Sequence, residues 1–283
     1  MHILATIVPA EINNVYVFLI LGSLSAMLVA VAKAGFGGSI GMLAYPVMLY
    51  AFGGDAFLAA GTQLPLLIAS DIPALVRWWR KWNGHAVRML LPGALAGIGL
   101  AWWALWMLIG DGRTAEQVKV AKAQANGVLL LLVGVIALAF VSLQVIRYLR
   151  RRALAFRPVP WQGAVAGGLT GVCSMLANAG GPITTMFLLP QEMPKGMYVA
   201  TTVLLYAVIN EVKIAPFWHL GMMTPHTLWA GLLLLPAAVA GTFLGLYLHD
   251  RVGQKQFNGI AYSLLFLAGI DMVHKGVRIL WFS

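Results

Sequence analysis

Two related stretches, KAGFGGSIGMLAYP at residues 33–46 and NAGGPITTMFLLP at residues 178–190, interrupt long apolar runs with clusters of glycine. Such a cluster frees backbone N–H and C=O groups where lipid offers no hydrogen-bonding partner, so the chain must be buried in protein there or line a polar cavity. Two interruptions at corresponding places in two halves of a chain are typical of the substrate site of a secondary transporter. The two stretches therefore predict a fold and the position of a site.

The chain as a whole is too apolar for a soluble domain, because 60% of its 283 residues are hydrophobic and only 10% are charged. The continuous apolar runs have helical periodicity or none, not the alternation of an outer-membrane barrel. An all-α, polytopic integral membrane protein with about eight to ten membrane segments is predicted, including two short glycine-broken helices at 38–52 and 180–191. The runs of about 20 residues, the length that crosses a bilayer, are 14–33, 56–76, 86–109, 125–146, 196–218, 226–248 and 256–280.

The net charge of +10 is concentrated in two short loops. Short loops rich in lysine and arginine stay on the cytoplasmic side of a membrane and can contact anionic headgroups. The charge therefore indicates orientation and membrane lipid as a partner, not nucleic acid, and we expect a multi-pass protein of a bacterial inner (plasma) membrane. The basic residues are Arg77, Arg80, Lys81 and Arg88 in one loop, and Arg147, Arg150, Arg151, Arg152 and Arg157 in the other.

The two halves of the sequence correspond beyond the glycine clusters, which predicts two tandem homologous repeats. Residues 1–110 form the first repeat, 111–160 its last helix with a basic cytoplasmic connector, and 161–283 the second repeat. The corresponding positions are Gly38 and Gly181, Asp71 and Glu211, Trp78 and Trp218, and LLPGALAG at 90–97 with LLPAAVAG at 234–241.

The orientation of the repeats depends on the segment 38–52. If it spans the bilayer, with tilt or local thinning, the repeats are inverted; if it is re-entrant, they are parallel. We favour inverted repeats, because that arrangement readily gives the two mirror-related states of alternating access.

Lys33 is the first candidate site residue, since it ends the first apolar run directly before the glycines. A charge at membrane depth usually faces a cavity or a partner. The freed N–H groups and the positive start of the next helix would attract an anion beside it. The alternative is a lysine that snorkels to the interface.

Asp71 and Glu211 occupy corresponding repeat positions, and Lys213 follows Glu211 on a different helix face. The acids either pair with Lys33 or Lys213 across the bundle, or one of them couples a proton or ion to transport. Alternatively, they cap helix ends near the basic loops, with Asp71 reaching Arg77 or Arg80. We expect Lys213 and Asn210 at the site.

Gln63, Asn178 and Thr201 are polar residues in apolar runs near the glycine breaks, and we expect them to bind an oxyanion. Such side chains also hydrogen-bond between membrane helices without any further role. Single Cys173 excludes a disulfide within one chain. No metal, Walker, GxSxG or dinucleotide motif is present, so neither an enzyme nor a metal or other cofactor is expected.

On these residues the sequence resembles the TauE/SafE family of sulfite and organosulfonate exporters over nearly the whole chain. The resemblance implies a bacterial inner-membrane carrier that moves small sulfur oxyanions or related anions, commonly outward. Glu211 departs from the usually apolar residue of the family and adds a negative charge near the expected site. The residues that carry the resemblance are Lys33, Gly35, Phe36, Gly37, Gly38, Pro46, Gly61, Asp71, Pro92 and Gly97, then Gly180, Gly181, Pro182, Leu189, Pro190, Gln191, Thr201, Asn210, Lys213, Pro236 and Gly241.

The sequence thus predicts a secondary transporter that exports a small anion, most readily sulfite or a short organosulfonate, by alternating access around the glycine breaks. An anion channel, a membrane subunit of a larger complex and a membrane-embedded enzyme stay open as alternatives, as does a homo-oligomer. The expected substrate-binding residues are Lys33, Gly35, Phe36, Gly37, Gly38, Gln63, Asn178, Gly180, Gly181, Thr201, Asn210 and Lys213, with Asp71 and Glu211 as candidates for coupling.

Overall fold

The computed structural model describes residues 14–36, 44–110, 115–150, 159–249, 251 and 254–282, and in these residues the regular structure is entirely helical. The predicted all-α fold is therefore confirmed. The helices are α2 (Val15–Phe36), α3 (Ala44–Ala51), α4 (Ala56–Arg77), α5 (Gly84–Ile109), α6 (Ala115–Arg150), α7 (Pro160–Ala177), α8 (Gly181–Leu188), α9 (Lys195–His219), α10 (Pro225–His249) and α11 (Gln254–Phe282), with a 3₁₀ turn at Leu189–Gln191.

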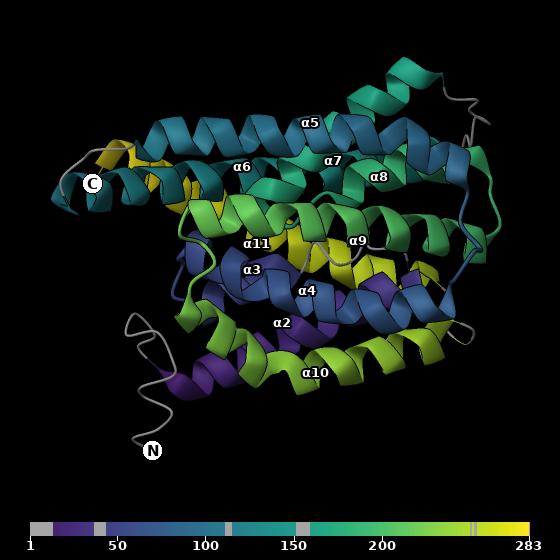
Figure 1. Cartoon of the computed structure of the whole chain (residues 1–283), viewed down its shortest axis with the longest axis horizontal. Coiled ribbons are helices and arrows are strands. Elements are labelled where there is room, and N and C mark those ends of the chain that lie inside the picture. The colour runs from purple at the N-terminus through teal and green to yellow at the C-terminus, as the bar shows by residue number, and fades with distance from the viewer. Residues whose placement is uncertain are drawn as a thin grey trace.

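Six of the described helices are long and apolar enough to cross a bilayer, which supports a multi-pass membrane protein. They lie roughly parallel along the long axis of the molecule (Figure 1). The six candidate spans are Val15–Phe36, Ala56–Arg77, Gly84–Ile109, Val120–Leu143, Lys195–His219 and Pro225–His249.

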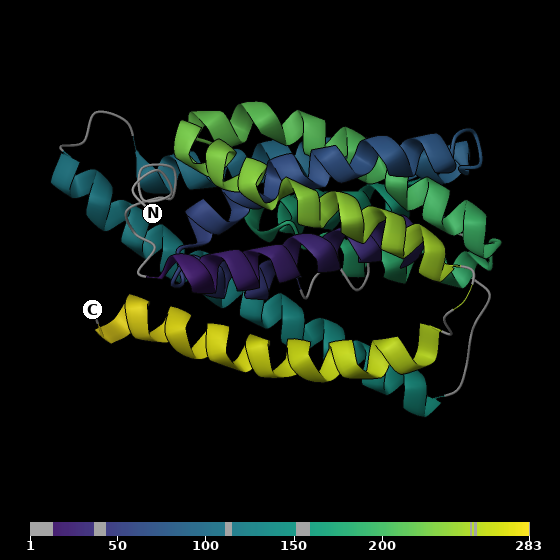
Figure 2. The same cartoon turned by 90° about the horizontal axis from the view of Figure 1, so that it is seen from below.

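Three helix pairs make the most extensive contacts in the bundle: α5 with α7, α2 with α10, and α6 with α11. Figure 2 shows α11 and α6 along one side of the molecule. Helices α4 and α9 lie between the first two pairs and contact each other. This places α4 and α9 where their polar side chains can meet in the interior.

Glycine allows the close approach of these pairs. A Cβ built on Gly97 of α5 would lie 2.1 Å from the carbonyl oxygen of Gly168 in α7. A Cβ built on Gly35 of α2 would lie 2.3 Å from the carbonyl oxygen of Gly245 in α10. Small residues at such crossings let two backbones pack directly, which is how helices associate where lipid removes the usual hydrophobic driving force.

The two halves of the chain begin at opposite ends of the bundle. Helix α2 begins at the end where α11 finishes, whereas α7 begins at the other end, beside the loop that joins α4 to α5 (Figure 1). This order agrees with an inverted arrangement. The homology of the halves and their boundaries at 110 and 160 stay predictions.

Candidate functional site

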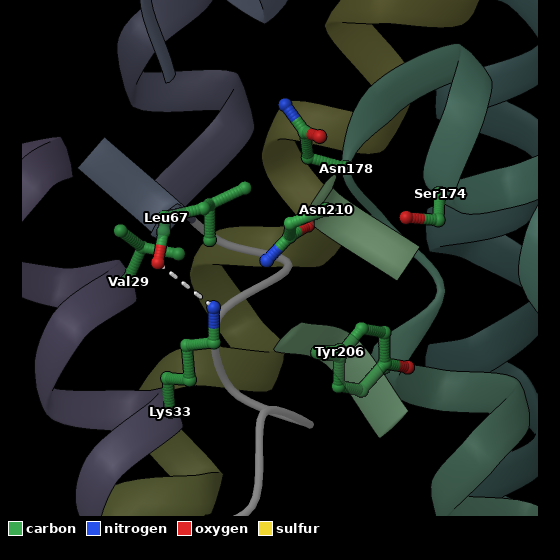
Figure 3. A pocket seen from close by; sticks show the side chains of 8 residues that line it. Val29, Lys33, Leu67, Ser174, Asn178, Tyr206 and Asn210 are labelled. Atoms are coloured by element: carbon green, nitrogen blue, oxygen red, sulfur yellow. Dashed lines mark hydrogen bonds between the residues drawn. The ribbon is translucent and has the colours of Figure 1, made fainter. Parts of the chain in front are cut away.

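A pocket lies in the middle of the bundle, where α2, α4, α7, α8 and α9 converge. Its empty volume is about 380 Å³. Figure 3 shows Lys33 beside Val29 and Leu67 on one side of this space, and the polar side chains of Ser174, Asn178, Tyr206 and Asn210 on the other. The lining residues are Val29, Lys33, Leu67, Ser174, Asn178, Gly181, Tyr206 and Asn210.

The second glycine break shapes one wall of the pocket. Helix α7 ends at Ala177, and Asn178 adopts the left-handed conformation at φ 51° and ψ 26°, which asparagine tolerates better than most residues. Helix α8 then begins at Gly181, which lines the pocket. The first turn of a helix has N–H groups without intrahelical acceptors and a partial positive charge. The break therefore presents a positive helix end to the pocket.

Lys33 forms a buried ion pair with Asp71 across the α2–α4 contact. Its Nζ lies 2.5 Å from Oδ1 of Asp71, and both side chains are only 5% exposed. The same Nζ donates a 3.0 Å hydrogen bond to the carbonyl oxygen of Leu67 (Figure 3). Nδ2 of Asn210 in α9 donates to the other carboxylate oxygen at 2.9 Å. Asp71 is thus held by both halves of the chain, and its charge compensates that of Lys33.

Lys213 is fully buried and has a different environment. Its Nζ donates to the carbonyl oxygen of Ser174 at 3.2 Å, to Oγ of Ser174 at 3.1 Å and to Oδ1 of Asn178 at 2.5 Å. Three acceptors match the three N–H bonds of an ammonium group. Among the described residues, Lys213 has no carboxylate within ion-pair distance. With both lysines and Asp71 ionised, the described site contains one more positive than negative charge.

Asn178 connects Lys213 to the opposite wall of the site. Its Nδ2 donates to Oε1 of Gln63 in α4 at 3.2 Å. Gln63 is completely buried, and its own Nε2 has no hydrogen-bond acceptor among the described residues. A buried donor without an acceptor is costly and rare in native structures. Nε2 of Gln63 can therefore donate a hydrogen bond to a ligand or to a neighbour that rearranges.

Seven of the predicted site residues meet at or next to this pocket. Helix spacing explains the grouping, since residues three and four apart share a face. Tyr206, Asn210 and Lys213 follow this spacing on α9, as do Gln63, Leu67 and Asp71 on α4. The seven predicted residues are Lys33, Gln63, Asp71, Asn178, Gly181, Asn210 and Lys213.

Gly35 and Phe36 were expected to bind substrate, but neither lines the pocket. Gly35 lies against the backbone of Gly245, and its carbonyl oxygen accepts a 2.5 Å hydrogen bond from Nδ1 of His249. Phe36 is buried in the hydrophobic core. Both residues pack the end of α2. Gly37 and Gly38 lie outside the described residues.

Contacts within the fold also explain why Thr201 and Gly180 occupy their positions, without a bound ligand. Oγ1 of Thr201 accepts from the backbone N–H of Asn83 at 2.9 Å and donates to the carbonyl oxygen of Met197 at 2.6 Å. A Cβ on Gly180 would lie 2.8 Å from the carbonyl oxygen of Thr170. Thr201 fixes the loop between α4 and α5, and Gly180 allows the chain to turn close to α7.

Glu211 lies on the exposed face of α9 and does not line the pocket. The negative charge that the sequence placed near the site is therefore directed away from it. The alternative in which Asp71 reaches Arg77 or Arg80 is also not observed, because its carboxylate bonds to Lys33 and Asn210.

Ser174 and Tyr206 line the pocket but were not predicted to bind a ligand. Ser174 lies four residues before Asn178, and Tyr206 four before Asn210, so the same helix-face spacing would have found both. The hydroxyl of Tyr206 shares a 2.7 Å hydrogen bond with Thr184 of α8. In the described part of the chain, no three His, Cys, Asp or Glu side chains are grouped as a metal site.

The chain matches the family model described as Sulfite exporter TauE/SafE over residues 23–272. The match includes every residue that lines the pocket. Neither a curated protein nor a solved structure matches the chain.

Proposed function

We propose that the chain exports a small anion as a secondary transporter of a bacterial inner membrane. The chain belongs to the sulfite exporter TauE/SafE family. Sulfite or a short organosulfonate is the substrate, and alternating access around the central pocket is the mechanism. Its family is one of membrane transporters, and its described helices are those of a multi-pass membrane protein.

The observation that carries this proposal is the buried amino group of Lys213, which has no carboxylate within ion-pair distance in the described part of the chain. A buried charge is costly unless it is paired and hydrogen-bonded. Hydrogen bonds to Ser174 and Asn178 satisfy its geometry, but they leave its charge uncompensated. An anion in the adjacent pocket supplies the missing negative charge.

The substrate would bind by replacing Oδ1 of Asn178 as a hydrogen-bond acceptor of Lys213. Oδ1 of Asn178 accepts from Lys213 at 2.5 Å, and a sulfonate or sulfite oxygen can take that hydrogen bond. Gly181, the first residue of α8, lines the same pocket, and the N–H groups at the start of a helix attract an anion. Because Asn178 ends α7 and also contacts Gln63 of α4, its release would loosen a contact between the two halves. Binding is thereby coupled to a change in helix packing.

Asp71 is the candidate for coupling a proton. It is buried and bonds to Lys33 of the first half and Asn210 of the second half. Protonation of Asp71 would remove the negative charge from both contacts. Glu211 is not part of this proposal, because it is exposed.

The proposal is tested by transport assays in proteoliposomes with a panel of sulfite, sulfoacetate, taurine and thiosulfate. A carrier gives saturable uptake and accelerated counterflow with at least one of the anions. Flux that does not saturate would indicate a channel, and no transport by the purified chain would favour a subunit of a larger complex.

The site is tested by Lys213→Met, a change that removes the charge and keeps most of the side-chain volume. We expect transport to fall by about ten- to a hundredfold, since a hydrogen bond to a charged group contributes about 1.5–3 kcal/mol. Lys122→Met, at an exposed position on α6, is the matched control. Equal transport by both variants would refute the assignment, provided that both remain monodisperse in detergent.

A further inference from the structure

We propose that the pocket selects singly charged anions over doubly charged anions of the same size. This inference rests on the proposed function and specifies its substrate class. It follows from the number of charges at the site, which the arrangement of Lys33, Asp71 and Lys213 determines.

The described side chains around the pocket include one compensated lysine and one uncompensated lysine. Lys33 is paired with Asp71 at 2.5 Å, whereas Lys213 has only neutral acceptors. Asp71 and Lys213 lie behind the lining, in contact with Lys33, Asn210, Ser174 and Asn178. Of the polar residues that line the pocket, Ser174, Asn178 and Asn210 are uncharged. The hydroxyl of Tyr206 is hydrogen-bonded to Thr184. The described site therefore has a net charge of one positive unit.

The hydrogen bonds of Lys213 support its charged form. Ser174 contributes a carbonyl oxygen, which can only accept, and a hydroxyl oxygen at 3.1 Å. Asn178 contributes its amide oxygen at 2.5 Å, while its amide nitrogen donates to Gln63. As the structure assigns the donors, Nζ donates to all three oxygens, which takes the three N–H bonds of the ammonium form, whereas a neutral amine would accept from the Ser174 hydroxyl.

A singly charged anion neutralises this site, and a doubly charged anion does not. The additional negative charge would be buried near the carboxylate of Asp71, and like charges in a buried site repel strongly. The partial charge at the start of α8, about half a unit, is too small to compensate a full charge. A doubly charged substrate must therefore bring a proton or another cation with it.

The test compares isethionate with sulfoacetate, two organosulfonates with the same sulfonate group and the same number of carbon atoms. Isethionate ends in a hydroxyl and has one charge, whereas sulfoacetate ends in a carboxylate and has two. Half-saturation concentrations are measured by counterflow in proteoliposomes at neutral pH. We expect sulfoacetate to bind at least about tenfold more weakly than isethionate.

Three variants change the charge of the site in steps. Asp71→Asn makes it doubly positive, and we expect it to reduce or reverse the preference for isethionate. Lys33→Gln makes it neutral, and we expect it to weaken both anions. The double variant Lys33→Gln with Asp71→Asn restores one positive charge and should recover the preference for isethionate. Asp271→Asn, which removes a partly exposed carboxylate of α11, is the control and should leave the preference unchanged.

The possible results separate the two proposals. Saturable transport without charge preference, or a preference that is the same in Asp71→Asn and in the double variant, would refute charge selection and leave the anion carrier intact. If Asp71→Asn does not fold, the parent and Lys33→Gln still decide, because a parent that binds sulfoacetate as tightly as isethionate, or a Lys33→Gln variant that binds both anions as tightly as the parent, would refute charge selection. The absence of saturable transport of either anion by any of the proteins would refute both proposals.

Discussion

Replacement of Gly35 by alanine tests whether this glycine packs two helices or binds substrate. The added Cβ would lie 2.3 Å from the carbonyl oxygen of Gly245 and 3.0 Å from its carbonyl carbon, whereas ordinary van der Waals contact begins at 3.4 Å. The obstructing atoms are backbone atoms of α10, so no side chain can rotate away. Helices α2 and α10 would have to separate.

The size of the effect follows from two opposing contributions. Overpacking costs about 1–3 kcal/mol, while glycine to alanine in a helix gains about 1 kcal/mol. The separation of the helices also strains the hydrogen bond between Gly35 and His249. We therefore expect Gly35→Ala to lower the free energy of unfolding by about 1–2 kcal/mol.

The matched control is Gly99→Ala in α5, where an added Cβ meets nothing within 4 Å. Helix propensity alone should stabilise this variant by up to about 1 kcal/mol. SDS-induced unfolding in detergent micelles measures both changes, and counterflow measures the substrate affinity of the folded fraction. If Gly35→Ala retained full stability but bound substrate more weakly, Gly35 would be a substrate-binding residue and the packing argument would be wrong.

Three further variants separate contacts of the site from contacts of the fold. Asn210→Leu removes the 2.9 Å hydrogen bond to Asp71, and we expect a loss of about 1–3 kcal/mol of stability by SDS unfolding; an unchanged value would argue against the buried network. Thr201→Val removes the hydrogen bond to Asn83 and should lower the melting temperature without changing the half-saturation concentration for substrate. Tyr206→Phe frees α8 from one hydroxyl contact and should change that concentration more than it changes the melting temperature.

Most of the long helices could be predicted closely from the sequence, but α6 begins ten residues before the expected run 125–146, and α7 (Pro160–Ala177) corresponds to none of the expected runs. The apolar runs 86–109 and 226–248 correspond to α5 (Gly84–Ile109) and α10 (Pro225–His249). The short helices could be predicted only in outline: the expected segment 180–191 is α8 followed by a 3₁₀ turn, and in the expected segment 38–52 the described part contains α3, Ala44–Ala51. Glycine and proline mark where such helices break, but the length of the remaining helix depends on tertiary packing.

The sequence could not predict which side of each helix faces the pocket, because the helices are apolar on most of their sides. Asp71 and Glu211 occupy corresponding positions of the two predicted repeats. In the structure, however, Asp71 accepts a hydrogen bond from Asn210, the residue before Glu211, and Glu211 is exposed. Consecutive residues of a helix point about 100° apart, so an error of one position changes the assigned face. Thr201 and Gly35, which the sequence predicts as binding residues, make packing contacts instead of lining the pocket, because a polar or small residue in a membrane helix can serve packing as well as binding.

The uncompensated lysine has a consequence for the energetics of a transport cycle. A carrier that returns empty moves one positive charge with its site, whereas a carrier loaded with a single negative charge moves none. A membrane voltage acts on a moving charge with about 2.3 kcal/mol per 100 mV for a full crossing. In the proposed cycle without a coupled proton, the electric field would therefore drive or retard the unloaded return, and the burial of Lys213 would make that step the one that senses voltage.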